Sequence, residues 1–142
     1  HKELTGADNI VTYAAAMGLS GAELRSRWAE IVAFADIGDV LEKPIKHYST
    51  GMQARLALSV ALCGKFDTLV LDEALSVGDQ SFRQKIRARL EQFHLEGGTL
   101  ILVSHDFEHI RSLCPRTIWL RDGRIVADGD TETVLRSYQA AS

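Results

Sequence analysis

The sequence has 142 residues, of which 46% are hydrophobic and 25% charged, as in a soluble globular domain with a sizeable core. The formal net charge of −3 gives no bulk attraction to nucleic acid or to an anionic membrane. No apolar run approaches the roughly 18 residues of a membrane span. The start, His1-Lys2-Glu3, lacks the apolar segment of a secretion signal. If the protein works at a membrane, we expect a partner to cross it.

The first part of the chain, up to about Lys46, has helical patterning. Ser20 and Glu23 have the spacing of a capping box at a helix start. Apolar residues then recur at helical spacing, namely Leu24, Trp28, Ile31, Val32 and Ala35. Gly38 and Pro44 are expected to end this helix and open a loop.

The rest of the chain is expected to alternate strands and helices. Met52–Cys63 is predicted to be a buried apolar helix, and an apolar stripe predicts another helix that ends at Gly97-Gly98. Apolar runs at Thr68–Leu71 and Thr99–Val103 are typical of buried parallel strands. A short helix should follow at Phe107–Leu113. Two strands at Thr117–Leu120 and Arg124–Ala127 should then form a hairpin around Asp122-Gly123, and a last helix should span Thr131–Tyr138. This order predicts an α/β architecture whose sheet is mainly parallel, with a small antiparallel edge.

Two adjacent carboxylates, Asp72 and Glu73, follow the first predicted strand. Burying a charge without a partner is costly, so neither is expected in the core. In a phosphoryl-transfer site, the first carboxylate can hold Mg²⁺, directly or through water, and the second can polarise an attacking water. The alternative interpretation is an acidic turn that caps the next helix.

Two further segments support a phosphoryl-transfer site when they are considered together with Asp72 and Glu73. Ser104-His105-Asp106 ends the second predicted strand, so His105 would lie beside Glu73 if the strands are neighbours. Tyr48–Met52 places small hydroxyl residues and a glycine at a helix start, where N–H groups and the helix dipole favour an anion. Ordinary helix capping is the alternative for both segments.

Taken together, these segments resemble the motifs of ABC ATPases, and the resemblance extends from about Leu4 onward. Tyr48–Met52 resembles the signature motif, and Thr68–Glu73 resembles Walker B with its catalytic glutamate. Ser76–Asp79 resembles the D-loop, and His105 resembles the switch histidine. The implied fold is α/β, a partial P-loop-NTPase core with a mainly parallel sheet plus a helical subdomain.

The residues of the signature-like motif narrow the resemblance to one group of ABC ATPases. Tyr48–Met52 reads Tyr-Ser-Thr-Gly-Met instead of the usual Leu-Ser-Gly-Gly-Gln, and it is similar to the form found in exporters of O-antigen, capsule and teichoic acid. Leu4–Gly6, Glu73–Asp79 and Ile118–Leu120 resemble the same group. The implied function is ATP binding and hydrolysis that energises export of a lipid-linked polysaccharide through a membrane partner.

The resemblance implies a second copy of the chain and a transmembrane permease as partners, with no nucleic acid. The signature residues would bind the γ-phosphate of ATP held by the other copy, and Asp79 would bridge the two copies. The residues assigned to nucleotide binding are Ser49, Thr50, Gly51, Met52 and Asp79. The protein would lie peripherally on the cytoplasmic face of a bacterial inner membrane.

The same resemblance implies ATP and Mg²⁺ as cofactors. Asp72 would support Mg²⁺, Glu73 would be the general base for water, and His105 would contact the γ-phosphate. Residues 1–47 would be the first part of the helical subdomain, and residues 48–142 would be the part of the ATPase core with the motifs. The apolar face around Trp28 and Phe34 is a candidate permease contact, and a packed core is the alternative.

One motif of the family, the Walker A loop, has no counterpart in these 142 residues. Lys65 follows Gly64, but the G-x-x-x-x-G-K-[ST] pattern is absent. The adenine-stacking aromatic and the Q-loop glutamine are also missing. We therefore expect the chain to be a fragment, or one part of a split protein, that alone binds ATP weakly and hydrolyses it negligibly.

Other interpretations remain. His105–His109 matches the H-x-x-E-H pattern of a zinc hydrolase, although His105 is expected to precede the helix. A non-transport ABC ATPase and a non-catalytic interaction module are further alternatives. The basic run Arg83, Lys85, Arg87 and Arg89 is expected to be a solvated helix face.

Overall fold

The first two helices begin at residues that cap them. The computed structural model describes residues 1–141, in which α1 spans Gly6–Ala16 and α2 spans Gly21–Ala35. The side chains of Thr5 and Ser20 each accept a hydrogen bond from the third helical N–H. The acidic side chain at that third position accepts one from the backbone N–H of the capping residue, which confirms the predicted capping box at Ser20. Helix α2 ends before Gly38, because Asp36 already adopts the left-handed conformation, and Gly38 then adopts it again with a φ of 61°.

Short 3₁₀ turns, η1 (Gly38–Val40) and η2 (Ile45–His47), lead to α3, which spans Thr50–Cys63. Helix α3 contributes to two separate buried clusters. Residues on one side pack with α1 and α2 in a helical cluster, whereas those on the other side pack with the strands and α4 in a sheet cluster. The first group is Leu56, Val60 and Cys63, and the second is Leu58 and Leu62.

The central strands, β1 (Thr68–Asp72) and β2 (Thr99–Val103), are parallel and are joined by α4 (Gln80–Leu95). Their register pairs Asp72 with Val103, so both strands end at the same edge. The expectation that both strands are buried is only half right. One face packs on the sheet cluster, while Val70, Ile101 and Val103 are exposed on the other.

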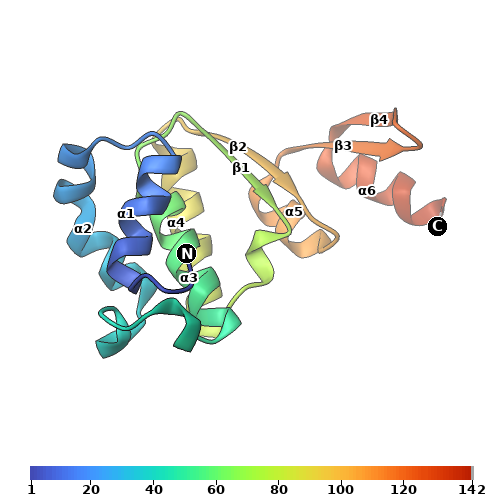
Figure 1. Ribbon diagram of the computed structural model, residues 1–142. Helices are drawn as coiled ribbons and strands as arrows, with labels where there is room; N and C mark the ends of the chain where they lie inside the picture. The colour runs from blue at the N-terminus through green and yellow to red at the C-terminus, as the bar shows by residue number, and fades with distance from the viewer. Residues whose placement is uncertain (142) are drawn as a thin grey trace.

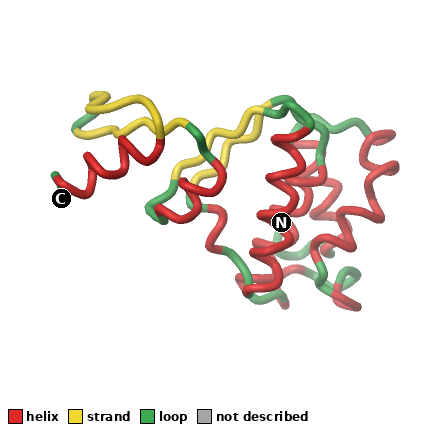
Figure 2. The backbone as a smooth tube through the Cα atoms, turned by 180° about the vertical axis from the view of Figure 1, so that it is seen from behind, coloured by secondary structure: helices red, strands yellow, loops and turns green. Residues whose placement is uncertain are grey.

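The chain ends in a small unit far from α1 and α2 (Figures 1 and 2). It contains β3 (Arg116–Arg121), β4 (Arg124–Asp130) and α6 (Thr131–Ala140), and α5 (Phe107–Leu113) connects it to β2. Tyr138 makes edge contacts with Trp119 and Phe107, which hold α6 against the hairpin and α5. Within the described residues β3 and β4 pair only with each other, so the antiparallel pair is a separate sheet rather than an edge of the parallel one.

The basic run on α4 is not a simple solvated face. Arg89 is mostly buried and donates from Nε to the carbonyl of Leu62 at 2.8 Å, so it satisfies the end of α3. Lys85 pairs with Asp36 at 3.0 Å. The prediction failed for Arg89 because α4 lies along α3, and this packing is not visible in local spacing. Lys85 remains 38% exposed, as a solvated position requires.

None of the helices within residues 1–141 has the length and apolarity needed to cross a bilayer.

Candidate functional site

Glu73 and His105 meet where the parallel strands end. The N–H of Glu73 donates to the carbonyl of Val103 at 2.9 Å, which extends the pairing of β1 and β2 by one step. In return, the N–H of His105 donates to Oε1 of Glu73 at 2.9 Å, and Nδ1 of His105 lies 2.7 Å from Oε2. The sequence prediction was conditional on neighbouring strands, and the structure meets that condition.

A left-handed backbone at Glu73 makes this contact possible. Its φ of 50° turns the chain sharply from β1 into the 3₁₀ turn η3 (Ala74–Ser76). Such a conformation is uncommon for a residue with a side chain, and it is typical of functional sites. No sequence pattern indicated it.

The contact with Glu73 controls the protonation of His105. The hydrogen bond to the Glu73 carboxylate, together with its negative charge, raises the pKa of His105 above the ordinary value. With Nδ1 engaged by Glu73, Nε2 is the nitrogen left for a ligand, and the side chain is 83% exposed. A protonated His105 can therefore donate to an anion. Each carboxylate oxygen of Glu73 keeps a second acceptor position, so the group can still accept from a water molecule.

Asp72 is the last residue of β1 and lies on its exposed side. It is next to Glu73 and level with Val103 in the register of the sheet. A carboxylate in this place, with hard oxygen donors, suits Mg²⁺.

The start of α3 holds the signature-like residues. Ser49 caps the helix by accepting from the N–H of Met52 at 3.2 Å. Thr50 is exposed, and a Cβ placed on Gly51 would meet nothing closer than the Ser49 Oγ at 3.8 Å. The first N–H groups of a helix have no partner within it, so this end is open to an anion. The Met52 side chain instead packs against the helical cluster.

Tyr48 fixes this helix start from inside the molecule. It is buried, and its hydroxyl donates to the carbonyl of Val40 at 2.5 Å. Burial raises the pKa of the Tyr48 hydroxyl. Gly6 packs against the ring so closely that a side chain there would collide with it. The tyrosine in the signature-like motif is therefore a core residue.

Asp79 lies at the start of α4 and is held from two sides. Its Oδ1 accepts from the N–H of Phe82 at 2.9 Å, and its Oδ2 pairs with Arg55 at 2.6 Å. The hydrogen bond from Phe82, followed by the charge of Arg55, keeps the pKa of Asp79 below its ordinary value.

Arg55 is a residue that the sequence reasoning missed. Its side chain is only 17% exposed, and it joins Asp79 and the carbonyl of Asp36 while lying over the Phe82 ring. It thereby ties the signature-like helix to the D-loop-like segment. A lone positive charge within an apolar helix was the available signal.

The predicted site residues thus fall into two groups. Glu73 and His105 are in contact, with Asp72 beside them. Ser49–Met52 lie at the start of α3, which Arg55 links to Asp79. No hydrogen bond or ion pair found within residues 1–141 joins one group to the other.

The zinc-hydrolase pattern is not supported by this geometry. His105 lies before α5, whereas His109 lies within it, and Nδ1 of His105 already faces Glu73. The two histidines therefore do not share a helix face, as a two-histidine metal site on one helix requires.

Several known proteins are similar to this chain over nearly its whole length. No family model matches the chain. The teichoic acids export ATP-binding protein TagH of Levilactobacillus brevis is 44% identical over 136 residues, which are 96% of this chain and 38% of that protein. The chain is homologous to ATP-binding proteins of this export type. TagH of Listeria innocua is 39% identical over 95% of the chain and 40% of its own length.

A further relative shares the ABC resemblance, and a solved structure shares the fold. The ABC transporter protein AbcA of Aeromonas salmonicida is 41% identical to the chain over 96% of it and 44% of its own length. A solved structure, described as the ATP-binding subunit of an ABC transporter, superposes with a TM-score of 0.84 at 22% identity, covering 98% of this chain and 58% of that one. The predicted fold class is therefore correct. The chain spans about two fifths of the length of the first two relatives.

Proposed function

We propose that this chain forms part of the ATP-hydrolysing subunit of an ABC exporter for a lipid-linked polysaccharide. The observation that carries the proposal is the contact between Glu73 and His105 at the ends of two parallel strands. The relatives support the substrate class, because several are named as teichoic acids export ATP-binding proteins.

In this proposal, Glu73 accepts a proton from the attacking water, while His105 holds Glu73 in place and donates to the γ-phosphate. The raised pKa of His105 supports this assignment, because it favours the protonated form that can donate to an anion. Asp72 would hold Mg²⁺, which neutralises the phosphate charge when ATP is bound. The exposed position of Asp72 at the strand end fits this cofactor.

The start of α3 would bind the γ-phosphate of ATP that a second copy of the chain holds. The open approach at Gly51 supports this, since a phosphate oxygen could come close to the helix N-terminus there. Ser49 and Thr50 would add hydroxyl donors. We propose that Asp79 lies at the contact between copies, and its tie to Arg55 would then couple that contact to the signature-like helix.

The assignment of Glu73 is tested by ATP hydrolysis in the full-length protein carrying these residues. We expect Glu73→Gln to lower kcat by about a hundredfold or more, because a general base contributes about that much. ATP binding should be retained. Glu42→Gln, a matched change at an exposed glutamate, should leave both unchanged.

Two results would contradict the proposal. If Glu73→Gln hydrolyses ATP as fast as the unmodified protein, Glu73 is not the base. If the unmodified protein binds ATP but does not hydrolyse it, the chain belongs to a non-catalytic interaction module instead.

The export substrate and the partners need a test in cells. We expect the full-length protein, together with a permease encoded beside it, to restore surface teichoic acid in a strain lacking TagH. The protein should then copurify with membranes through that permease and lie on their cytoplasmic face. Hydrolysis without restored surface polymer would leave a non-transport ABC ATPase or another transport substrate as the better interpretation.

The absent Walker A motif leads to a test on the 142-residue chain itself. We expect calorimetry to detect no Mg-ATP binding, because no loop in the sequence cradles the α- and β-phosphates. Micromolar binding at one site per chain would overturn this expectation. We also propose a division between residues 1–47 and 48–142, although α3 packs in both buried clusters.

A further inference from the structure

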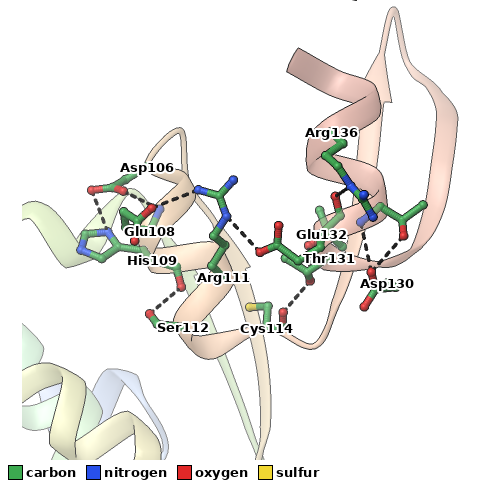
Figure 3. Close-up of polar contacts among 12 residues, drawn as sticks. Asp106, Glu108, His109, Arg111, Ser112, Cys114, Asp130, Thr131, Glu132 and Arg136 are labelled. Atoms are coloured by element: carbon green, nitrogen blue, oxygen red, sulfur yellow. Dashed lines mark hydrogen bonds and ion pairs between the residues drawn. The ribbon is translucent and has the colours of Figure 1, made fainter. Parts of the chain in front are cut away.

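His109 is a histidine that the proposed mechanism does not use. Its side chain is 28% exposed, but its Nδ1 is buried and has no hydrogen-bond partner among the described residues. The atom lies 3.6 Å from Oδ2 of Asp106, just beyond hydrogen-bond length (Figure 3). A buried polar atom that lacks a partner is costly, so a small shift that brings these two atoms together is favourable.

Asp106 is the residue that connects His109 to the candidate site. Its Oδ1 accepts from the N–H of Glu108 at 2.9 Å and so caps α5, which leaves Oδ2 facing His109. Its own N–H donates to the hydroxyl of Ser104 at 3.0 Å. The N–H of His105, between these two residues, donates to Glu73. The loop that presents His105 is therefore held on one side by Glu73 and on the other by the cap at Asp106.

The other charged groups near His109 are already engaged. Arg83 and Arg87 line the same hollow between α4 and α5 as His109. Arg83 donates to the carbonyl of Gly78 at 2.9 Å, and Arg87 pairs with Glu91 at 3.0 Å. The carboxylate that faces His109 is thus that of Asp106.

We propose that His109 is a positioning residue for the Glu73–His105 pair, and that it acts by holding the Asp106 carboxylate in its capping orientation. Without this contact, Asp106 can rotate, the start of α5 loosens, and His105 loses its fixed approach to Glu73. This inference rests on the proposed ATP hydrolysis for its effect on rate, but the effect on the loop is independent of it.

The test compares His109→Leu with His109→Asn in the full-length protein. The asparagine amide nitrogen lies the same number of bonds from Cα as Nδ1, so it can donate to Asp106, whereas leucine cannot. We expect His109→Leu to lower kcat about tenfold, equivalent to loss of one hydrogen bond. The KM for ATP should stay within about twofold, and His109→Asn should retain most of the rate. If His109 contributed only to general stability, kcat would not fall while KM stays unchanged. His109→Leu and His109→Asn would also not differ in this way.

Hydrogen exchange gives a readout that does not depend on activity. The amides of His105, Asp106 and Glu108 should exchange faster in His109→Leu and near the original rate in His109→Asn. If exchange changes as expected but the unmodified protein hydrolyses no ATP, the proposed function fails and the positioning contact stands. If His109→Leu alters neither exchange nor kcat in an active protein, the inference is overturned.

A double substitution checks that the effect passes through Asp106. Asp106→Ser keeps a capping oxygen but removes the one that faces His109. We expect this change to reproduce the loss of kcat, and the double variant with His109→Leu to be no slower than either single one. Additive losses would show that His109 acts by another route and would contradict the proposal.

Discussion

At the scale of single residues, the site depends on contacts that neighbouring strands create. The sequence predicted that Glu73 and His105 would meet if their strands were neighbours, and the parallel pairing of β1 with β2 meets that condition. It could not predict Arg55, whose partner Asp79 lies 24 positions away and is reached only through the packing of α3 against α4. The left-handed turn at Glu73 also had no sequence signal, because glutamate rarely adopts it.

The protonation of His105 should depend on Glu73. Because the Glu73 hydrogen bond raises the pKa of His105, the pair stabilises the fold fully below the unfolded-state pKa. That contribution is lost as pH rises through the raised value. NMR titration should show the His105 midpoint moving down, towards about 6.5, in Glu73→Gln. An unchanged midpoint in Glu73→Gln would mean that the two side chains do not interact in solution, and Glu42→Gln serves as the control.

Gly6 should tolerate no side chain. A Cβ there would lie 2.9 Å from the carbonyl oxygen of Leu41 and would collide with the Tyr48 hydroxyl. We expect Gly6→Ala to destabilise the protein by about 2 kcal/mol, as overpacking does. Gly21→Ala is the matched control, since a Cβ there meets only the flexible end of Arg25 at 3.4 Å. Chemical denaturation should separate the two variants, and equal stabilities would refute the close packing at Tyr48.

At the scale of elements, the sequence predicted most helices and strands, and their ends followed from local chemistry. Thr99–Val103 and Phe107–Leu113 were placed correctly, because a glycine pair precedes the strand and Asp106 and Pro115 bound the helix. The burial of the strands and the place of the hairpin were less predictable. Both depend on which elements pack together, and residue patterns do not encode that directly.

The capping box at Ser20 should contribute measurably to stability. Its hydroxyl accepts from the N–H of Glu23 at 3.3 Å, and Glu23 accepts from the N–H of Ser20 at 2.8 Å. We expect Ser20→Ala to cost about 1 kcal/mol in the free energy of unfolding. Ser26→Ala, on an exposed turn of the same helix, should change it by less than about 0.5 kcal/mol. The prediction fails if both substitutions have the same effect on thermal unfolding.

At the scale of the whole molecule, the parallel sheet is covered on one side only. Parallel sheets are normally covered on both faces by the helices that connect their strands. Here Val70, Ile101 and Val103 remain exposed on the face opposite the sheet cluster. An apolar face of this kind favours association.

We therefore expect the 142-residue chain to self-associate through this face. Ile101→Lys should reduce the association, because it places a charge at the centre of the patch. Sedimentation velocity at several concentrations would measure this. Arg124→Lys, an exposed basic residue of the hairpin, is a charge-conserving control that should leave association unchanged. If Ile101→Lys associates as strongly as the unmodified chain, another surface is responsible.

The double packing of α3 limits how its sequence can change. Inserting one residue into an α-helix rotates everything after it by about 100°. In α3, such an insertion before Leu56 would turn the residues of both clusters away from the faces that they pack against. Single substitutions in this helix can be accommodated one contact at a time, but a change of length cannot. Insertions and deletions in related sequences should therefore fall in the turns between α2 and α3 or in the hairpin, and spare Thr50–Cys63.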